Sequence, residues 1–411
     1  MSYLISRANK SLDTRIALPA SKSISNRVLV ISALCDHPFL IRNLSDSDDT
    51  RAMQKVFRSS GNVFDIGHAG TTMRFLTAFL SRIVGEWILT GSDRMKQRPI
   101  RILVNALREL GALIDYTERE GFPPLRIRGS HLKGKSLELE GSISSQYISA
   151  LLLIAPVIEG GLTLRLRGEV TSRSYIFMTL KMMEHFGIRH SWKGPDICIP
   201  EQEYQPSPYT VEADWSAASY WYEILALAGK GEVALNNLQF PGLQGDSVQA
   251  GWFEAFGIRS RVTAKGIIIS RNTDQAPDFL KLDLIENPDL AQTMAVLCVM
   301  KKIPFHFSGL STLKIKETDR IAALCRELAK FGARLEEPAS GELGWDGCFP
   351  HPSAQVPVIS TYHDHRMALA FAPAALNGQV IIEDPMVVTK SYPGYYEDLK
   401  KAGFTVEKTN S

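Results

Sequence analysis

The sequence predicts an α/β protein built from more than one domain. Short apolar runs typical of strands alternate with amphipathic runs typical of helices from one end of the chain to the other, and this alternation characterises the α/β class. The length of 411 residues corresponds to two or three domains of ordinary size. Hydrophobic residues make up 45% of the chain and charged residues 22%, as in globular proteins that dissolve in water.

Helix-like and strand-like runs can be assigned along the chain. Five segments with a helical pattern end in the same way, with a glycine followed by an apolar residue. Glycine readily takes the left-handed conformation that closes a helix, so the recurrence indicates a repeated supersecondary unit, although ordinary helix termination explains it equally well. The helix-like runs are 26–34, 101–110, 176–186 and 320–331, the strand-like runs are 162–166, 266–269 and 379–382, and the glycines are Gly111, Gly187, Gly257, Gly332 and Gly403.

The best internal boundary is the segment 203–213. Pro206 and Pro208 interrupt the pattern there, and Asp214 is placed to begin a new helix. This boundary divides the chain into two halves of similar size.

Charge and composition exclude several classes of partner. The formal net charge is only +2, which argues against a nucleic-acid or membrane partner. The five cysteines form no CxxC pair, as expected for reduced thiols. The segment 1–16 has no apolar run, and the longest apolar stretch, 148–158, is too short to span a bilayer. We therefore expect a cytoplasmic protein.

Four predicted helix starts carry hydroxyl side chains, and three of them also carry basic side chains. The first N–H groups of a helix lack internal partners, and the helix dipole there favours negative charge, so these starts suit phosphate or carboxylate. Each alone is more often a plain N-cap or a solvated face, but four in a nearly neutral chain indicate anionic ligands. In the last of them, Lys316 and Arg320 are four residues apart and are expected to share a helix face. The four segments are 19–27, 67–74, 142–146 and 316–320.

These segments and several others resemble the signatures of the EPSP synthase family, in the family's order from residue 18 to residue 393. The matching segments are LPASKSISNR at 18–27, GHAGTTMR at 67–74, RMKQRPI at 94–100, SSQY at 144–147, SRSY at 172–175, PD at 288–289, KETDR at 316–320, DHRM at 364–367 and KSYP at 390–393.

The resemblance implies a fold of two domains called an inside-out α/β barrel, in which each domain consists of three βαβαββ units. Domain I would comprise residues 1–20 and 213–411 and carry the acid and base carboxylates. Domain II would comprise residues 21–212 and form the shikimate 3-phosphate side. The hinge would lie near residues 20 and 213, and helix N-termini of both domains would face the cleft between them.

The resemblance also implies an activity. Enzymes of this family transfer the enolpyruvyl group of phosphoenolpyruvate to the 5-hydroxyl of shikimate 3-phosphate, by addition and elimination through a tetrahedral ketal. The products are 5-enolpyruvylshikimate 3-phosphate and phosphate, on the route to chorismate and the aromatic amino acids. No cofactor and no metal are expected, and the chain is expected to be a monomer.

Site residues follow from the matching motifs. Catalysis is assigned to Lys22, Asp289 as the base and Glu317 as the proton shuttle at C3. Phosphoenolpyruvate would be bound by Lys22, Gly70, Arg98, Gln146, Arg320, Arg366 and Lys390. Shikimate 3-phosphate would be bound by Lys22, Ser23, Arg27, Ser144, Ser145, Gln146, Ser172, Tyr175, Asp289 and Lys316. Arg74 is a weaker candidate, and a structural role is its alternative.

Three departures from the family pattern stand out. The stretch 49–67 is shorter than expected, as if a hairpin were missing from one repeat. His68 replaces the usual Asn near phosphoenolpyruvate, and Thr312 stands where several members have an Asn that contacts shikimate 3-phosphate. Because Gly70 leaves the phosphoenolpyruvate site open, we expect sensitivity to glyphosate, which competes with phosphoenolpyruvate in this family.

Two other functions remain open at this point. An enolpyruvyl transferase acting on UDP-N-acetylglucosamine would share the fold, but it normally has Asn after the first Lys and a reactive Cys, whereas Ser23 follows Lys22 here and 94–100 contains no Cys. A catalytically silent anion-binding protein on the same fold is the second alternative. His363 and His365 could face one side of a strand as a metal pair, but a third ligand at suitable spacing is absent.

Overall fold

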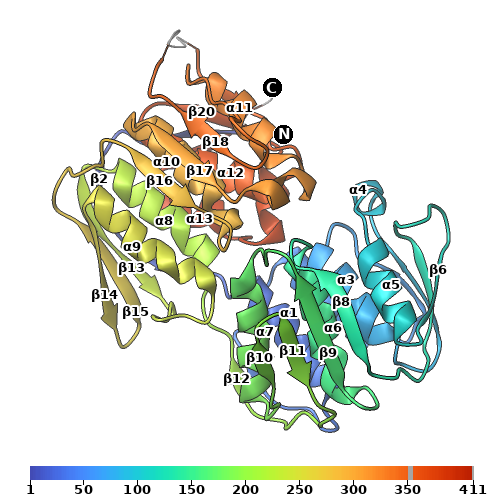
Figure 1. Ribbon diagram of the computed structural model, residues 1–411. Helices are drawn as coiled ribbons and strands as arrows, with labels where there is room; N and C mark the ends of the chain where they lie inside the picture. The colour runs from blue at the N-terminus through green and yellow to red at the C-terminus, as the bar shows by residue number, and fades with distance from the viewer. Residues whose placement is uncertain (350–354, 410–411) are drawn as a thin grey trace. The chain divides into compact units, whose positions relative to one another are not determined.

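The computed structural model describes residues 1–349 and 355–409 (Figure 1). The chain divides into two compact units: unit 1 comprises Met1–Pro19 and Glu212–Ser411, and unit 2 comprises Ala20–Val211. Asp214 caps α8 (Trp215–Leu227), the first helix after the chain returns from unit 2 to unit 1, as its position in the sequence indicates. Within the described residues, no helix combines the length and apolarity needed to cross a membrane.

Unit 2 contains two complete βαβαββ repeats. In each repeat the first two strands are parallel, and the third and fourth form a hairpin that pairs antiparallel with the second. The first repeat is β4 (Val63–Asp65), α3 (Gly70–Leu80), β5 (Glu86–Thr90), α5 (Arg101–Glu109), β6 (Leu113–Tyr116) and β7 (Leu125–Arg128), with the short α4 (Asp93–Lys96) before α5. The second is β8 (Ser136–Glu140), α6 (Ser145–Ile154), β9 (Leu162–Arg167), α7 (Arg173–His185), β10 (Ser191–Lys193) and β11 (Asp196–Ile199).

The remaining repeat of unit 2 is truncated. It has α1 (Lys22–Leu34), α2 (Asp48–Arg58) and a two-stranded parallel sheet of β3 (Ile41–Arg42) and β12 (Tyr209–Thr210). Only residues 59–62 separate α2 from β4, so no hairpin follows α2. This is the feature expected from the shortness of the stretch 49–67.

The sheets of unit 1 use strands from both ends of the chain. β2 (Ser11–Ala17) pairs parallel with β13, and β1 (Ser2–Ser6) lies between β20 and β21, so the N-terminus completes two repeats of the C-terminal half. The middle sheet has three strands, and its hairpin is reduced to a bridge between Glu336 and Gly344. The sheets are β14-β15-β13-β2, β16-β17-β18 and β19-β20-β1-β21, with β13 Lys230–Asn236, β14 Ile258–Thr263, β15 Gly266–Arg271, β16 Leu280–Asp283, β17 Phe305–Ser308, β18 Leu343–Trp345, β19 Val358–Ile359, β20 Val380–Glu383 and β21 Thr405–Thr409.

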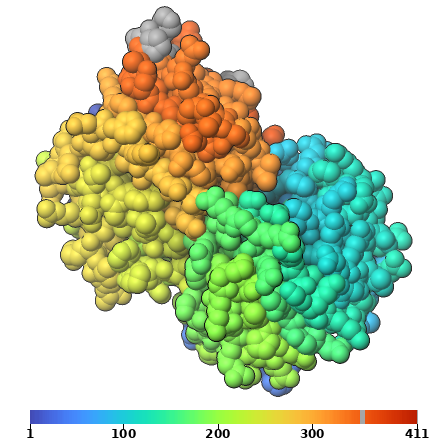
Figure 2. Space-filling model, in the orientation of Figure 1, coloured from blue at the N-terminus to red at the C-terminus, as the bar shows by residue number. Residues whose placement is uncertain are grey.

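The two helices of a repeat differ in burial. Every residue of α3, α8 and α12 (His365–Phe371) is buried, and so are most residues of α1, α6 and α10 (Ala291–Lys301). These first helices are buried on most or all sides and carry many apolar residues, so they form the core of each unit. Most residues of α1 are buried, and on the face shown in Figure 2 little of the blue N-terminal segment is visible.

The second helices are amphipathic, and the glycines found in the sequence mark their ends. All five glycines have a positive φ, between 74° and 102°. They follow α5, α7, the turn η3 (Phe253–Phe256) after α9 (Gln249–Trp252), α11 (Arg320–Ala329) and α13 (Tyr395–Lys401). The repeated unit is therefore confirmed, and the glycine is missing only after α2 of the truncated repeat, among the residues described.

Candidate active site

Asp289 is the centre of a charged cluster in unit 1. It lies on the turn η4 (Pro288–Leu290) that leads into the core helix α10. Its Oδ1 accepts a hydrogen bond from Nη1 of Arg320 at 2.9 Å, and its Oδ2 accepts one from Nη2 of Arg366 at 2.7 Å. The ammonium of Lys316 is 3.8 Å from Oδ1. Three cations from distant parts of the sequence thus converge on one carboxylate.

Arg320 links this carboxylate to two more. Its guanidinium, only 2% exposed, donates to Asp364 at 2.7 and 3.2 Å and to Glu317 at 3.0 Å. The other oxygen of Glu317 accepts a hydrogen bond from Lys390 at 2.7 Å. Four cations and three carboxylates therefore form one connected cluster.

Helix starts bring these side chains together. Asp364 caps the core helix α12 by accepting from the backbone N–H of Arg366 at 2.9 Å, so Arg366 stands in the first turn. Asp319 caps α11 in the same way, and Arg320 is the first residue of that helix. Lys390 ends the turn η7 (Pro385–Lys390) that precedes α13.

The expectation that Lys316 and Arg320 share a helix face is wrong. Because Asp319 is the N-cap of α11, Lys316 lies before the helix, at the end of the turn η5 (Ser311–Ile315). The two side chains meet at Oδ1 of Asp289 instead. The capping aspartate, rather than helical periodicity, sets their geometry.

Burial and charge act in opposite directions on these groups. Burial raises the pKa of Asp289, but Arg366, Lys316 and Arg320 together outweigh it and hold that pKa well below its usual value. Burial likewise lowers the pKa of Arg320, and Asp364, Glu317 and Asp289 more than reverse this. Burial lowers the pKa of Lys316 despite Asp289. Asp289 is thus ionised in the free protein.

Removing Arg320 is expected to destabilise unit 1. In Arg320→Met the buried carboxylate of Asp364 loses its bidentate partner, which costs about 3–5 kcal/mol for a buried ion pair. Urea unfolding followed by circular dichroism would measure this. The control is Arg165→Met, which removes an equally short but exposed pair with Asp196 and should leave the midpoint nearly unchanged. Equal midpoints for both variants would contradict the structural role of Arg320.

In unit 2, the candidate anion-binding residues lie at the starts of the three core helices. Ser21 caps α1, so Lys22 and Ser23 occupy its first turn, and both are partly exposed. Gly70 is the first residue of α3. Ser144 caps α6, and Ser145 and Gln146 follow it. The amide Nε2 of Gln146 donates to Thr71 Oγ1 at 3.4 Å, which ties the start of α6 to that of α3.

Arg98 packs against Gly70. A Cβ atom added at Gly70 would collide with Nη1 of Arg98, so the absence of a side chain is what admits the guanidinium. Arg74, one turn further along α3, donates to the carbonyls of Gly70 and Pro99 at 3.2 and 3.3 Å. Burial and the charge of Arg98 lower the pKa of Arg74 to about 10. The contacts of Arg74 support its structural alternative, as a positioning group for Gly70 and Arg98.

Arg27 is more buried than expected for a residue predicted to bind shikimate 3-phosphate. It is 2% exposed and donates to Thr179 Oγ1 at 2.8 Å, to Ser149 Oγ at 3.0 Å and to the carbonyls of Ser23 and Tyr175. Burial lowers its pKa to about 10. All of these partners are neutral, so within the described part of the chain Arg27 brings a positive charge without a carboxylate partner close to the first turn of α1.

Ser172 stands at the start of α7 with a left-handed backbone, at φ 52° and ψ 40°. Serine takes this conformation rarely, and such strain concentrates at functional positions. Its carbonyl accepts from the N–H of Tyr175 at 3.1 Å, which fixes the first turn of the helix. Both residues therefore lie at a helix start, as the other candidates of unit 2 do.

The histidines do not form a metal pair. His363 and His365 lie on a turn and a helix start rather than on a strand: His363 has a φ of 55° and is 84% exposed, whereas His365 begins α12 and is buried. Within the described ranges, no group of three potential ligands could hold a metal ion. His68, one of the departures from the family pattern, pairs with Ser92 Oγ at 2.8 Å, and Thr312 lies in η5.

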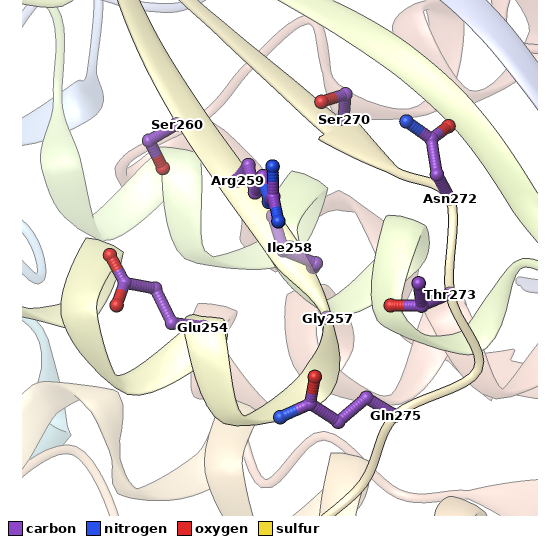
Figure 3. A pocket seen from close by; sticks show the side chains of 9 residues that line it. All are labelled: Glu254, Gly257, Ile258, Arg259, Ser260, Ser270, Asn272, Thr273 and Gln275. Carbon is purple, nitrogen blue, oxygen red and sulfur yellow. The ribbon is translucent and has the colours of Figure 1, made fainter.

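A pocket of about 610 Å³ lies elsewhere in unit 1, against the hairpin of β14 and β15 (Figure 3). Glu254 and Arg259 are its charged residues, and it contains none of the residues predicted from the sequence. It therefore lacks the concentration of positive charge that two phosphorylated substrates would require.

Asp364, Ser216 and Asp246 were not predicted from the sequence, although each contacts the charged cluster or a residue beside it. Asp364 was visible in the DHRM segment, but its role depends on Arg320, 44 residues away. Ser216 and Asp246 lie at the start of α8 and in the turn η2 (Gly245–Val248), where no family signature was noticed.

Comparisons with known proteins agree with this geometry. The chain is 51% identical to a 3-phosphoshikimate 1-carboxyvinyltransferase of Bacteroides fragilis over 99% of both chains. It is 37% identical to one of Vibrio cholerae, covering 93% of this chain and 95% of that one. The fold matches that of an EPSP synthase from Acinetobacter baumannii with a TM-score of 0.78 at 21% identity, covering 99% of this chain and all of that one.

The match to the family itself extends over residues 6–64 and 58–399, nearly the whole chain. It includes the starts of all three core helices in each unit and every residue of the charged cluster around Asp289. The chain belongs to the EPSP synthase (3-phosphoshikimate 1-carboxyvinyltransferase) family.

Proposed function

We propose that the chain transfers the enolpyruvyl group of phosphoenolpyruvate to the 5-hydroxyl of shikimate 3-phosphate, which releases phosphate in the step of the shikimate pathway that leads to chorismate. The observation that carries the proposal is the cluster in unit 1, where Lys316, Arg320, Arg366 and Lys390 surround Asp289 and Glu317. Both substrates carry one phosphate and one carboxylate, so together they bring a charge of about −5 to −6. Guanidinium groups suit such ligands because they bind phosphate and carboxylate bidentately.

The ion pairs of the free protein explain how Asp289 would act as a base. Arg366 and Lys316 keep the pKa of Asp289 low as long as no substrate anion competes for their charge. Phosphate and carboxylate groups of the substrates would compete for the same cations, which would weaken their hold and raise the basicity of Asp289. The carboxylate would then accept the proton of the 5-hydroxyl as that oxygen attacks C2 of phosphoenolpyruvate.

Glu317 is the proposed proton carrier at C3. Its carboxylate touches both Lys390 and Arg320, which we assign to phosphoenolpyruvate. Protonation of C3 accompanies the attack at C2, and loss of a proton from C3 accompanies the departure of phosphate from the tetrahedral ketal. A carboxyl group that contacts both cations would be close enough to serve both steps. Lys22 would stabilise the charge that develops during them.

Residues of unit 2 complete the proposed assignments. Lys22, Gly70, Arg98 and Gln146 are assigned to phosphoenolpyruvate, and the starts of α1, α6 and α7 to shikimate 3-phosphate, together with Asp289 and Lys316 from unit 1. This sharing of residues, and a hinge near residues 20 and 213, remain predictions from the family resemblance. We also propose that the enzyme is a monomer, that it lies in the cytoplasm and that it needs no metal or cofactor.

A steady-state assay of phosphate release in the presence of a chelator tests the function. We expect turnover with shikimate 3-phosphate and none with UDP-N-acetylglucosamine. The names of the relatives favour shikimate 3-phosphate as the acceptor. Binding of both substrates by calorimetry without phosphate release would instead favour the silent anion-binding protein. Sensitivity to glyphosate is checked in the same assay by an inhibition titration.

Substitution of Gly70 tests the proposed role of Arg98. In Gly70→Ala the new methyl group would displace the guanidinium, so the KM for phosphoenolpyruvate is expected to rise about 10- to 100-fold, as misplacement of a binding group by about 1 Å can cause. Gly251→Ala is the control, because no atom lies within 4 Å of the added methyl group. An unchanged KM in Gly70→Ala would contradict the assignment of Arg98 to phosphoenolpyruvate binding.

A further inference from the structure

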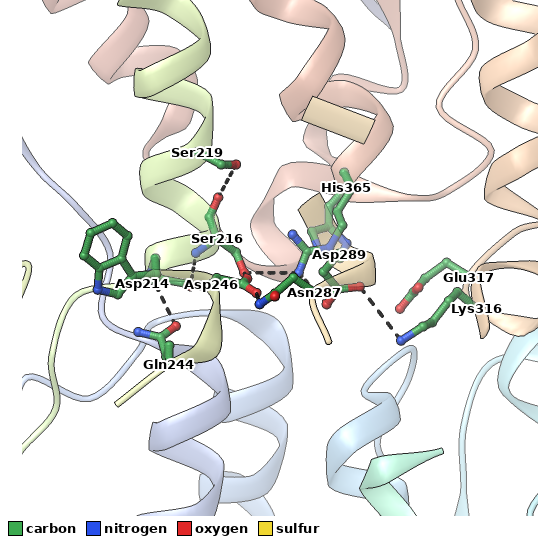
Figure 4. Close-up of polar contacts among 12 residues, drawn as sticks. Asp214, Ser216, Ser219, Gln244, Asp246, Asn287, Asp289, Lys316, Glu317 and His365 are labelled. Carbon is green, nitrogen blue, oxygen red and sulfur yellow. Dashed lines mark hydrogen bonds and ion pairs between the residues drawn. The ribbon is translucent and has the colours of Figure 1, made fainter. Parts of the chain in front are cut away.

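Asp246 is a buried carboxylate directly behind the charged cluster of unit 1. It lies in the turn η2 and is only 4% exposed. Its Oδ2 accepts a hydrogen bond from Ser216 Oγ at 2.5 Å, and its Oδ1 accepts one from Asn287 Nδ2 at 3.1 Å (Figure 4). Ser216 and Asn287 are themselves buried, so these contacts are shielded from water.

Both partners of Asp246 lead to the cluster. Nη2 of Arg366 donates to Ser216 Oγ at 3.5 Å, and the same nitrogen donates to Asp289 at 2.7 Å. Asn287 is two residues before Asp289, at the start of the turn that carries it. Figure 4 shows Asp246 between Ser216 and Asn287, with Asp289 beyond them.

The direction of the hydrogen bonds depends on the charge of Asp246. An ionised carboxylate only accepts, so the hydroxyl of Ser216 must donate to it and offers its lone pairs to Arg366. The pKa of Asp246 is raised, because burial and the nearby charge of Asp289 outweigh the hydrogen bond from Ser216 and the charge of Arg366, which favour the ionised form. An amide at this position could donate to Ser216, which would turn the hydroxyl hydrogen toward the N–H groups of Arg366.

We propose that Asp246 is a positioning residue of the active site, which orients Arg366 through Ser216 and holds the turn of Asp289 through Asn287. The inference rests on the proposed function, in which Arg366 binds phosphoenolpyruvate and Asp289 is the base. A buried carboxylate with two neutral partners is costly for stability alone, and a role in orienting the cluster accounts for it.

The two branches can be tested separately. Ser216→Ala removes the link to Arg366, so the KM for phosphoenolpyruvate should rise more than kcat falls. Asn287→Ala frees the turn of Asp289, so kcat should fall with little change in KM. Asp246→Asn should show both effects, each about 10- to 100-fold, the range that loss of an orienting partner causes at other buried sites. In the double variant Asp246→Asn with Ser216→Ala, the rise in KM should equal that of Asp246→Asn alone.

Glu327→Gln is the matched control. Glu327 is a carboxylate of the same unit, 1% exposed, that pairs with Lys330 and accepts hydrogen bonds from Tyr362 and from the backbone of Ser360. Its amide variant should change the unfolding midpoint but neither kinetic constant. Wild-type kinetics in Asp246→Asn, identical changes in the two branch variants, or multiplying effects in the double variant would overturn the inference.

If Asp246→Asn does not fold, the two branch variants decide. If the wild type itself releases no phosphate, the proposed function fails, and calorimetry of phosphoenolpyruvate binding then judges the inference. Affinity at least about tenfold weaker in Ser216→Ala than in the wild type would support it, and equal affinity would overturn it.

Discussion

Asp289→Asn is expected to lower kcat by about 100- to 10,000-fold, the range in which a general base contributes. The substitution keeps the shape of the side chain, but its one amide oxygen can accept a hydrogen bond from only one of Arg320 and Arg366, and it cannot take up the proton of the 5-hydroxyl. Steady-state phosphate release with shikimate 3-phosphate and phosphoenolpyruvate measures the change. A kcat within threefold of wild type would exclude Asp289 as the base.

The same variant has a characteristic dependence of stability on pH. Because the cations hold the pKa of Asp289 below its usual value of about 4, the ionised carboxylate stabilises the folded protein at every pH above that value. The contribution is lost only as the pH falls through the lower pKa of the folded state. Wild type should therefore unfold at higher urea concentration than Asp289→Asn at neutral pH, and the difference should shrink below about pH 4. A constant difference from pH 7 to pH 3 would argue against these ion pairs.

Lys22→Met is expected to lower kcat by about 100- to 1000-fold and to weaken the binding of phosphoenolpyruvate. Lys22 stands in the first turn of α1 and is partly exposed, so its ammonium adds to the positive end of the helix dipole. A single preorganised donor to developing negative charge contributes an effect of this size. Methionine keeps the length and apolar body of the side chain, which isolates the loss of charge.

Kinetics and calorimetry with phosphoenolpyruvate check this prediction. Lys55→Met is the matched control, because Lys55 is an exposed lysine in the last turn of α2 of the same unit. It should bind and turn over substrates as the wild type does. Near-normal constants in Lys22→Met would show that the first turn of α1 takes no part in the reaction.

The repeated architecture was largely predictable from the sequence because it depends on local chemistry. The glycines after the amphipathic helices are such a signal: each supplies a left-handed C-cap, and together they mark the second helix of five of the six repeats. The missing hairpin after α2 was visible as a short stretch of chain. The helix cap Asp214 was predictable for the same reason, since a cap needs only neighbouring residues.

The charges of the site were predictable as a set but not as pairs. The motifs named Asp289, Lys316 and Arg320, yet the helical spacing assumed for the two basic residues was wrong because Asp319 begins the helix after Lys316. The burial of individual cations could not be predicted from the sequence either. Arg27 and Arg74 resemble surface cations in the sequence, but they lie inside unit 2 with neutral hydrogen-bond partners.

By itself, the sequence determined the α/β class and the residue types that an anionic pair of substrates requires, and it indicated the repeats. Those features follow from interactions within a few residues, which a linear pattern records. Only the tertiary structure decided that Arg320 joins Asp289, Glu317 and Asp364, and that Asp246 stands behind Ser216 and Asn287. Around Arg366, such contacts join residues 77 positions apart in the case of Asp289 and 150 positions apart in the case of Ser216, so a linear pattern does not record them.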